Sequence, residues 1–238
     1  MQSSKRICVS AGVTGVAISL AVLAAGASAV GPRPATTLRA LYGLKPPAEL
    51  NAARTALLLV DFQDEFVHGG LPLPDGRAAI LRARELAAWA RRSGVLVVCV
   101  QNIVTRVGSP LFAPGASTSA FVPELAPGPQ DLVLVKATGG AFSRTKLDDE
   151  LRSRGIDTLI VAGFMTHLAV LTTANDGSSL GYRVLVAADA TATRTLPGAI
   201  ATASIDAKNL QRASLATLAD RVADVLSSAA ITKLPVVR

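Results

Sequence analysis

The chain has 238 residues, of which 50% are apolar and 17% are charged, and it carries a formal net charge of +7. This length and composition predict one globular domain with a full hydrophobic core. The basic excess is scattered, without a run of Lys and Arg and with few aromatic residues between them, so nucleic-acid binding is not indicated.

The first 29 residues predict a secretory signal peptide. Lys5 and Arg6 precede an apolar run at about 7–25, and Ala27-Ser28-Ala29 forms an A-x-A cleavage pattern. We therefore expect residues 1–29 to be removed and the protein to be exported, periplasmic or secreted, with no membrane attachment after cleavage. The alternative is an uncleaved membrane anchor, which is disfavoured because the clean apolar core is shorter than the about 20 residues that span a bilayer.

Removal of this segment leaves 22 basic and 17 acidic side chains, a net charge of +5, and a single cysteine. One cysteine cannot form an internal disulfide, so the core alone has to stabilise the fold. Cys99 lies in the apolar stretch GVLVVCVQN, where a buried thiol is normally inert. His68 and His167 have no potential ligands around them at metal-ligand spacing, so we expect neither a metal nor a cofactor.

Residues 30–53, VGPRPATTLRALYGLKPPAELNAA, predict an irregular, Pro-rich N-terminal arm that precedes a folded domain at 54–238. Within this domain, apolar runs of strand length alternate with amphipathic segments of helical period. The predicted strands are at 55–62, 95–101, 131–137, 157–164 and 182–189, with a short sixth at 222–228, and the predicted helices are at 76–94, 145–156, 168–180 and 206–221. The segment 102–130 is rich in Pro, Gly and Ser and predicts a long loop.

Two of the predicted helices carry signals of their own. In the helix at 145–156, Thr145 and Asp148 have capping-box spacing and Gly155 is the expected stop. The helix at 168–180 contains Asn175-Asp176-Gly177, which are poor helix formers, and the glycine alone costs about 1 kcal/mol relative to alanine. We interpret this run as a sign of relaxed constraint near the turn that precedes the helix.

Strands that are apolar throughout and alternate with helices are typical of a parallel sheet covered on both faces. The sequence therefore predicts the α/β class, as a three-layer α/β/α sandwich around a mostly parallel sheet of five or six strands with right-handed crossovers. Ligands bind such sheets at the carboxyl ends of the strands. Those ends carry Asp61, Gln101, Lys136, the turn 163–169 and Asp189.

Asp61 and Lys136 are charged residues that end two otherwise apolar strands. A charge at the mouth of a parallel sheet is costly to desolvate unless it is paired, so we expect these two side chains to be partners. A nearby ammonium would keep the carboxylate ionised and available as a base or acid. The alternative is a purely structural pair, or two unrelated charges at strand ends.

Three stretches in this order resemble the isochorismatase-like, or cysteine hydrolase, family: LLLVDFQDEF, VLVKATGGAFSRTKLDDELRSRGIDTLIVAGFMTH and LGYRVLVAADATATRTLP. The resemblance covers about residues 54–230 and implies an isochorismatase-like hydrolase domain at 54–238. It also implies an Asp/Lys/Cys triad of which Asp61 and Lys136 are two members. It further implies a cis peptide between Phe164 and Met165, and oxyanion donors in the backbone N–H groups of Met165 and Ala169.

Ala169 occupies the position of the family's nucleophilic cysteine. A methyl group cannot attack a carbonyl, so the covalent thioester route is closed. The isochorismatase branch of the family lacks the cysteine and hydrolyses a vinyl ether through acid chemistry from the Asp, with a His at the position of His167. Two further alternatives are a pseudoenzyme that binds a small amide or acid without turnover, and an engineered replacement of a cysteine by Ala169.

We therefore expect a hydrolase acting on a small molecule with an amide, urea or enol-ether bond, or else an inactive small-molecule-binding protein. The expected substrate-binding residues are Phe62, Phe66, Gln101, Phe142, Phe164 and His167, with Phe112 as a further wall and Arg106 or Arg144 as an anion contact. The resemblance also implies a homo-oligomer in which neighbouring loops close the site. A third alternative is an interaction protein that assembles through the Pro-rich arm and the loop 102–130.

Overall fold

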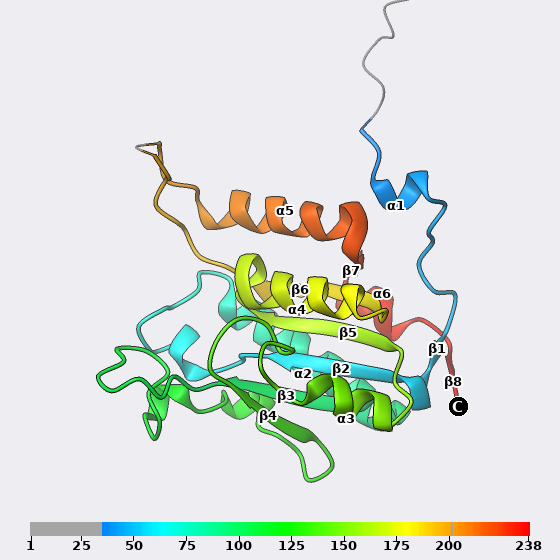
Figure 1. The fold of residues 1–238 in the computed structure, drawn as a ribbon, viewed down its shortest axis with the longest axis horizontal. Helices are drawn as coiled ribbons and strands as arrows, with labels where there is room; N and C mark the ends of the chain where they lie inside the picture. Colours follow the sequence, from blue (N-terminus) through cyan, green and yellow to red (C-terminus); the bar gives the residue numbers. More distant parts are fainter. Residues whose placement is uncertain (1–34, 201) are drawn as a thin grey trace, which may run out of the picture. The chain divides into compact units, whose positions relative to one another are not determined.

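A parallel sheet of six strands forms the centre of the fold, in the order β4-β3-β2-β5-β6-β7 (Figure 1). The strands are β2 Thr55–Val60, β3 Leu96–Asn102, β4 Leu132–Lys136, β5 Thr158–Phe164, β6 Arg183–Ala192 and β7 Asp224–Leu226. Every neighbouring pair in this sheet is parallel. The predicted sheet, including its short sixth strand, is confirmed.

The computed structural model describes residues 35–200 and 202–238, so the predicted signal peptide at 1–29 lies outside the described residues. The chain separates into residues 1–35 and the unit Thr36–Arg238, and the sheet and the helices around it belong to the second unit. None of the helices in the described part of the chain combines the length and the apolar character that crossing a bilayer requires.

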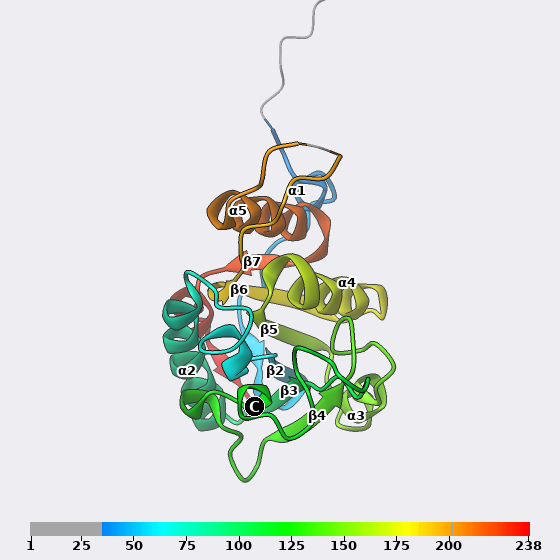
Figure 2. The ribbon, with the colours of Figure 1, turned by 90° about the vertical axis from the view of Figure 1, so that its left-hand side faces the viewer.

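Helices cover both faces of the sheet, which gives the three predicted layers (Figure 2). The helices are α1 Leu38–Leu41, α2 Gly76–Ser93, α3 Leu147–Ser153, α4 Leu171–Ser179, α5 Ala207–Thr217 and α6 Ser228–Thr232. In β2, Leu57 and Leu59 pack into the core cluster that contains α2, whereas Leu58 and Val60 pack into the cluster that contains α3 and α4. Because successive strand residues point to opposite faces, one apolar run supplies both cores.

The start of α3 differs from its prediction. Lys146, and not Thr145, occupies the N-cap position, its side chain makes no cap hydrogen bond, and α3 begins only at Leu147. The Asp148 carboxylate accepts hydrogen bonds from the Tyr182 hydroxyl at 2.7 Å and from Arg152 Nε at 2.9 Å. The Thr145 hydroxyl does accept a hydrogen bond of 3.3 Å from the Leu147 N–H, but the Asp148 half of the predicted capping box is wrong, because its carboxylate is bonded to these two side chains. Gly155 follows the helix with a φ of 70°, as its predicted role as a stop requires.

The N-terminal arm, predicted to be irregular, contains regular secondary structure in its described part. It contains the short helix α1 and the strand β1, Leu50–Asn51, which pairs in parallel with β8, Val236–Val237, near the end of the chain. The Arg39 guanidinium donates a hydrogen bond of 2.5 Å to the Asp224 carboxylate, which is almost fully buried. The described part of the arm is thus attached to the domain through the Arg39–Asp224 pair, through the pairing of β1 with β8 and through hydrogen bonds of Leu38 and Lys45.

The run Asn175-Asp176-Gly177 lies inside α4, as predicted, but packing explains its glycine. A Cβ atom on Gly177 would lie 2.9 Å from Leu159 Cδ1, closer than side chains approach each other in a packed core. The Asn175 side chain donates to the Leu171 carbonyl within the same helix. Close contact between α4 and β5 therefore accounts for the glycine at position 177.

Candidate active site

Asp61 and Lys136 form a buried ion pair at the carboxyl end of the sheet. Lys136 is the last residue of β4, and Asp61 directly follows β2. Lys136 Nζ lies 2.8 Å from Asp61 Oδ2, with side-chain exposures of 2% and 5%. Between them, at the end of β3, Asn102 Oδ1 accepts a second, longer hydrogen bond of 3.4 Å from Lys136 Nζ. The pair predicted from the two strand ends is thus present.

The Asp61 backbone has a left-handed conformation with a φ of 57°. Asp and Asn tolerate this region better than other residues with a side chain, and such conformations cluster at functional sites. The Asp61 N–H donates to the Val100 carbonyl at 2.9 Å, and the Asp61 carbonyl accepts from Gln63 N at 2.8 Å. The backbone leaves β2 at this residue and holds the carboxylate at the carboxyl end of the sheet.

Burial raises the pKa of Asp61 to about 6, against the opposing charge and hydrogen bond of Lys136. Its second oxygen, Oδ1, is buried and has no hydrogen-bond partner among the described residues. A carboxylate with one free oxygen and a pKa near neutrality can take up or release a proton close to physiological pH. This is the property that a general base or general acid requires.

The turn after β5 forms the opposite wall of the site. The Phe164–Met165 peptide bond is cis, as the family resemblance implied. A single wide turn of π-helix, Thr166–Val170, then leads into α4, so that helical backbone begins two residues before the predicted Leu168. Met165 and Ala169 both line the site, and Ala169 has 4% of its surface exposed.

Gly163 allows this turn to lie against the strand that carries Asp61. Its φ is 144°, and a Cβ atom at this position would lie 2.1 Å from the Val60 carbonyl oxygen. Only glycine fits such a close approach of two backbones. The pairing of β5 with β6 also shifts register between Val161 and Gly163. The turn 163–169, here called the elbow, and the Asp61 carboxylate are therefore neighbours because residue 163 lacks a side chain.

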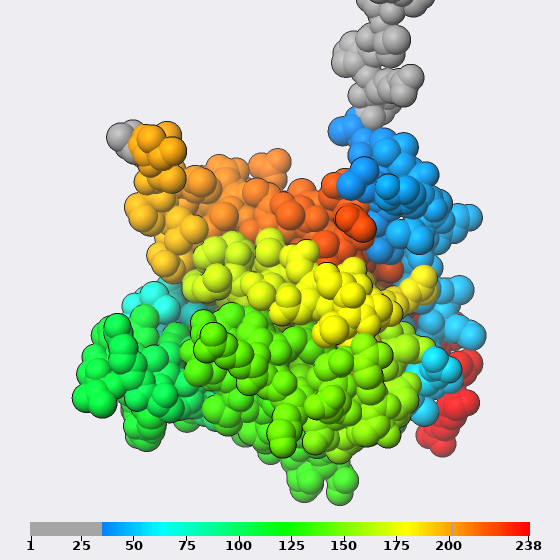
Figure 3. All heavy atoms as spheres, viewed as in Figure 1, coloured from blue at the N-terminus to red at the C-terminus, as the bar shows by residue number. Residues whose placement is uncertain are grey.

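A cavity of about 220 Å³ opens between the ion pair and the elbow. Its walls combine aromatic and aliphatic side chains with a few polar groups. They consist of Asp61, Phe66, Asn102, Val104, Phe112, Lys136, Ala137, Thr138, Gly139, Phe164, Met165, Leu168 and Ala169. The loops that contribute to it lie at the end of the sheet where β2, β3 and β5 terminate, and they cover that end in the space-filling view (Figures 1 and 3).

One buried carboxylate holds the loop that supplies Phe112. Glu65 accepts hydrogen bonds from the Gly70 N–H at 2.5 Å, the Thr118 hydroxyl at 2.8 Å and the Phe112 N–H at 3.5 Å. Phe112 itself has a φ of 54°, and its ring lies 5.4 Å from that of Phe66. The wall of the cavity thus depends on contacts between segments about 50 residues apart.

Several residues expected to bind substrate do not line this cavity. Phe62 is fully buried and packs edge-on against Phe164, with ring centroids 4.7 Å apart. Gln101 donates to the Ser119 carbonyl, Phe142 packs against Tyr182, and His167 Nδ1 is hydrogen-bonded to Thr193 Oγ1. Burial, with a smaller effect of Arg194, lowers the pKa of His167. Phe66 and Phe164, in contrast, are on the walls.

Asp189, Arg106 and Arg144 are also absent from the walls of this cavity. The Asp189 carboxylate accepts from the backbone N–H and the hydroxyl of Ser228, and so ties β6 to the start of α6. Sequence reasoning missed Asn102, Val104 and the segment 137–139. Asn102 could have been found, because it directly follows the predicted strand 95–101 at the same sheet edge.

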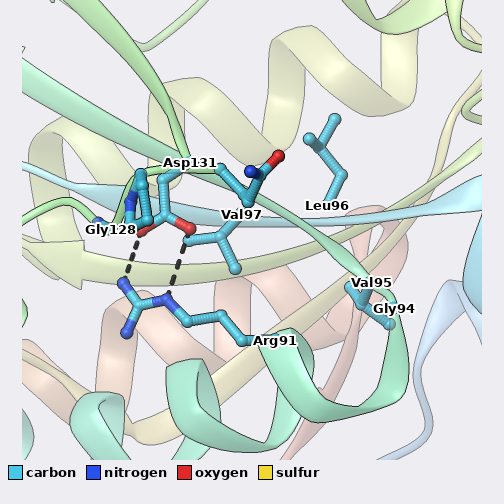
Figure 4. Close-up of a pocket in the computed structure, with 9 residues that line it drawn as sticks. Arg91, Gly94, Val95, Leu96, Val97, Gly128 and Asp131 are labelled. Atoms are coloured by element: carbon cyan, nitrogen blue, oxygen red, sulfur yellow. Dashed lines mark hydrogen bonds and ion pairs between the residues drawn. The ribbon is translucent and has the colours of Figure 1, made fainter.

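A second cavity, of about 330 Å³, lies at the opposite end of the sheet, where β3 and β4 begin (Figure 4). Arg91 donates to both oxygens of Asp131 there, at 2.5 and 3.3 Å. Cys99 lies beside this pair, and its pKa is raised to about 12 by burial and by Asp131. The thiol is therefore protonated at neutral pH, and the arginine and aspartate satisfy each other.

No group of three His, Cys, Asp or Glu side chains in the described part of the chain is arranged to hold a metal ion. His68 Nδ1 lies 2.6 Å from Asp64 Oδ1.

Comparison with known proteins agrees with this geometry. The sequence pattern of the isochorismatase domain matches residues 55–230. The chain is 30% identical over 193 residues to the secreted isochorismatase effector Isc1 of Verticillium dahliae. This match covers 81% of this chain and 97% of that protein. It is 34% identical over 183 residues to a streptothricin hydrolase of Streptomyces noursei, with 74% of this chain and 63% of that protein covered. The crystal structure of an isochorismatase from Pseudomonas putida KT2440 superposes with a TM-score of 0.76 at 33% identity, covering 83% and 100% of the two chains. The chain belongs to the isochorismatase family.

Proposed function

We propose that this protein is an exported hydrolase that cleaves a C–N or C–O bond of a small molecule, of amide, urea or enol-ether type, without a cysteine nucleophile. The observation that carries this proposal is the buried Asp61–Lys136 pair with its free carboxylate oxygen, beside a cavity and an elbow that ends in Ala169. Export is supported by the predicted signal peptide and by the similarity to a secreted relative.

Ala169 stands where the family resemblance places a cysteine, and its methyl group offers no electron pair. For an amide or urea, a water molecule becomes the nucleophile and attacks the carbonyl carbon, while its proton passes to Asp61 Oδ1. The Met165 and Ala169 N–H groups stabilise the resulting oxyanion. Asp61 then returns the proton to the leaving nitrogen as the C–N bond breaks, which regenerates the carboxylate.

For an enol ether, the same group works in the opposite protonation state. The protonated Asp61 carboxyl donates its proton to the vinyl carbon, and water adds to the oxygen-stabilised cation that forms. One proton of the added water passes to Asp61 and restores the acid, and the other passes to the leaving oxygen as the C–O bond of the adduct breaks, which yields a carbonyl compound and an alcohol. Lys136 supports either route, because its charge stabilises the Asp61 carboxylate.

The second candidate is an inactive binding protein on the same fold. The observation that favours it is Ala169 itself, since the cavity and the ion pair would still hold a small amide or acid. This candidate predicts ligand binding without turnover.

The test is turnover of a panel of amides, ureas and enol ethers by the wild type and by Asp61→Asn. Asparagine retains the shape of the side chain and tolerates the left-handed backbone, but it cannot accept a proton from water. We expect hydrolysis by the wild type and none by the variant. Asp64→Asn is the matched control, because Asp64 pairs with His68 and does not line the cavity.

Turnover retained by Asp61→Asn contradicts the mechanism. A wild type that turns over no member of the panel, while a small ligand raises its melting temperature, favours the binding protein.

A further inference from the structure

A third cavity, of about 340 Å³, opens between the N-terminal arm and the end of the sheet where β6 and β7 begin. Its walls come from the arm, the end of α4, the start of β6 and the turn of π-helix Leu218–Val222. They consist of Arg39, Tyr42, Leu44, Ser178, Tyr182, Arg183, Val184, Arg221 and Val222. The arm, blue in Figures 1 and 3, lies at the opposite end of the sheet from the loops of the candidate active site.

The walls of this cavity are basic. Three of the lining residues are arginines, and none is acidic. In the two cavities described above, each cation on the wall contacts a carboxylate, Lys136 that of Asp61 and Arg91 that of Asp131. The cavity beside the arm therefore differs from both by an excess of positive charge.

Two of its three arginines lack an acidic partner. Arg39 is neutralised by the Asp224 carboxylate, at 2.5 Å. Arg183 and Arg221 form no ion pair with an acidic side chain within the described ranges 35–200 and 202–238. Arg183 donates a hydrogen bond of 3.4 Å to the Lys45 carbonyl of the arm, which carries no charge.

The acidic residue next to Arg221 in the chain is engaged elsewhere. Asp220 accepts a hydrogen bond of 2.9 Å from the Leu38 N–H, and it does not line the cavity. The walls thus present two guanidinium groups without a counter-ion.

Two unpaired guanidinium groups on one cavity favour a ligand with two negative charges. Each guanidinium offers a planar fork of N–H donors that matches the oxygens of a carboxylate or a phosphate. A phosphate monoester carries about −1.5 to −2 charges at pH 7 and three acceptor oxygens, so it can pair with both arginines at once. A ligand with a single negative charge leaves one of them unpaired. Ser178 adds a hydroxyl to the same wall.

The remaining walls suit an apolar or aromatic body attached to the phosphate. Tyr42 and Leu44 expose 72% and 50% of their surface. The Tyr182 hydroxyl is hydrogen-bonded to Asp148 at 2.7 Å, so this residue offers its ring. The volume of about 340 Å³ lies at the lower end of the about 300–1,000 Å³ that is typical of ligand pockets. A phosphate group with a single ring is therefore the expected size.

We propose that the cavity beside the arm binds a small phosphate monoester, with the phosphate between Arg183 and Arg221 and the body of the ligand against Tyr42 and Leu44. The ligand then bridges the arm and the domain. This site shares no residue with the candidate active site, so the inference does not depend on the proposed hydrolysis.

The experiment compares phenyl phosphate with phenyl sulfate, which has the same ring and a tetrahedral anionic group but one negative charge. Affinities of the purified protein are measured by calorimetry in phosphate-free buffer at about pH 8, where the monoester is a dianion because its second pKa is about 6. We expect phenyl phosphate to bind at least about tenfold more tightly than phenyl sulfate. Amide hydrogen exchange at residues 36–45 should slow when phenyl phosphate is bound, because the ligand holds the arm against the domain.

Arg183→Gln and Arg221→Gln should each weaken binding of phenyl phosphate by at least about tenfold, because each removes hydrogen bonds between charged groups. Both side chains are on exposed residues, and thermal unfolding without ligand checks that the variants stay folded. Arg84→Gln is the matched control. Arg84 is an exposed arginine of α2 that also lacks an ion pair among the described residues, but it does not line the cavity, so its loss should leave the affinity unchanged.

Three results would overturn the proposal. One is a wild type that binds phenyl phosphate no more tightly than phenyl sulfate, or that binds neither. Another is an equal loss of affinity in Arg84→Gln and in the two cavity variants, which would show unspecific attraction by the basic surface. The third is binding that leaves hydrogen exchange at residues 36–45 unchanged, which would place the ligand elsewhere.

Discussion

Lys136 Nζ contacts Asp61 Oδ2 although β4 and β2 are not neighbours in the sheet. The ammonium reaches across the end of β3, where Asn102 supplies a second acceptor. The register aligns Asn102 with Lys136, while Val60 aligns with Val100 on the other side of β3. The ion pair is therefore a product of the register of three strands, and it exists only in the folded sheet.

The pH dependence of the rate should reveal the role of Asp61. As a base it acts in its ionised form, and its pKa is about 6 because burial disfavours the charge. For an amide or urea substrate, kcat/KM should then rise about tenfold per pH unit below pH 6 and level off above it. The measurement is a pH profile of initial rates. A profile that falls above pH 6 instead assigns the acid role, and with it an enol-ether substrate.

The same titration should affect stability. The pKa of Asp61 is raised from 3.8 to about 6, so the folded state holds the proton more tightly than the unfolded state between these values. The stabilising contribution of this group is thus fully present below pH 3.8 and is lost as pH rises through 6. Relative to Asp61→Asn, the wild type should lose up to about 3 kcal/mol of unfolding free energy between pH 4 and 7. Urea unfolding at several pH values measures the difference, which a pH-independent offset would contradict.

The ion pair of the candidate site could be predicted from the sequence, because both of its residues stand at the ends of apolar strands. Asp61 and Lys136 each end an apolar strand, and the rule that parallel strands present their carboxyl ends at one edge suffices to bring them together. The sheet, its six strands and the cis peptide followed from apolar runs and from the family motifs. Phe112 was expected as an apolar wall and does line the cavity, but the contact that positions its loop could not be predicted, because it is made to a carboxylate 47 residues away. The orientation of the His167 side chain could not be predicted either, because it depends on the turn of π-helix and on the hydrogen bond to Thr193.

Ala169→Cys tests the link between the elbow and a thiol mechanism. A cysteine there would lie on the cavity wall at the first turn of a helix, where a thiol is more easily ionised. We expect new amidase activity that iodoacetamide abolishes. The wild type should be insensitive to the reagent, because the pKa of Cys99 is raised to about 12.

Ala169→Ser is the control for this variant, since a hydroxyl without a strong base stays protonated. A cysteine variant that neither gains activity nor reacts with iodoacetamide would show that this elbow does not activate a nucleophile.

Glu65→Gln should loosen the aromatic wall of the cavity. The amide group of glutamine places an additional donor among the N–H and O–H groups that now donate to the carboxylate, so at least one buried bond is lost. We expect a loss of about 1–3 kcal/mol in unfolding free energy and a several-fold rise in KM or ligand Kd with a smaller change in kcat. Glu124→Gln, which breaks only a surface ion pair with Arg77, should cost less than about 1 kcal/mol. Equal effects of the two substitutions would contradict this role for Glu65.

Gly163→Ala should be the most damaging of these changes, because it acts on backbone and not on a side chain. The added Cβ atom would lie 2.1 Å from the Val60 carbonyl oxygen, between two central strands that cannot both stay in place. Gly155→Ala is the control, since Gly155 also has a positive φ but has open space around its Cα. It should cost only the about 1–2 kcal/mol of a left-handed residue with a side chain. Thermal unfolding should therefore show a much larger loss for Gly163→Ala, with loss of ligand binding as Asp61 moves with Val60. If the two variants were equally stable, the approach of β5 to β2 could not be what requires a glycine at the elbow.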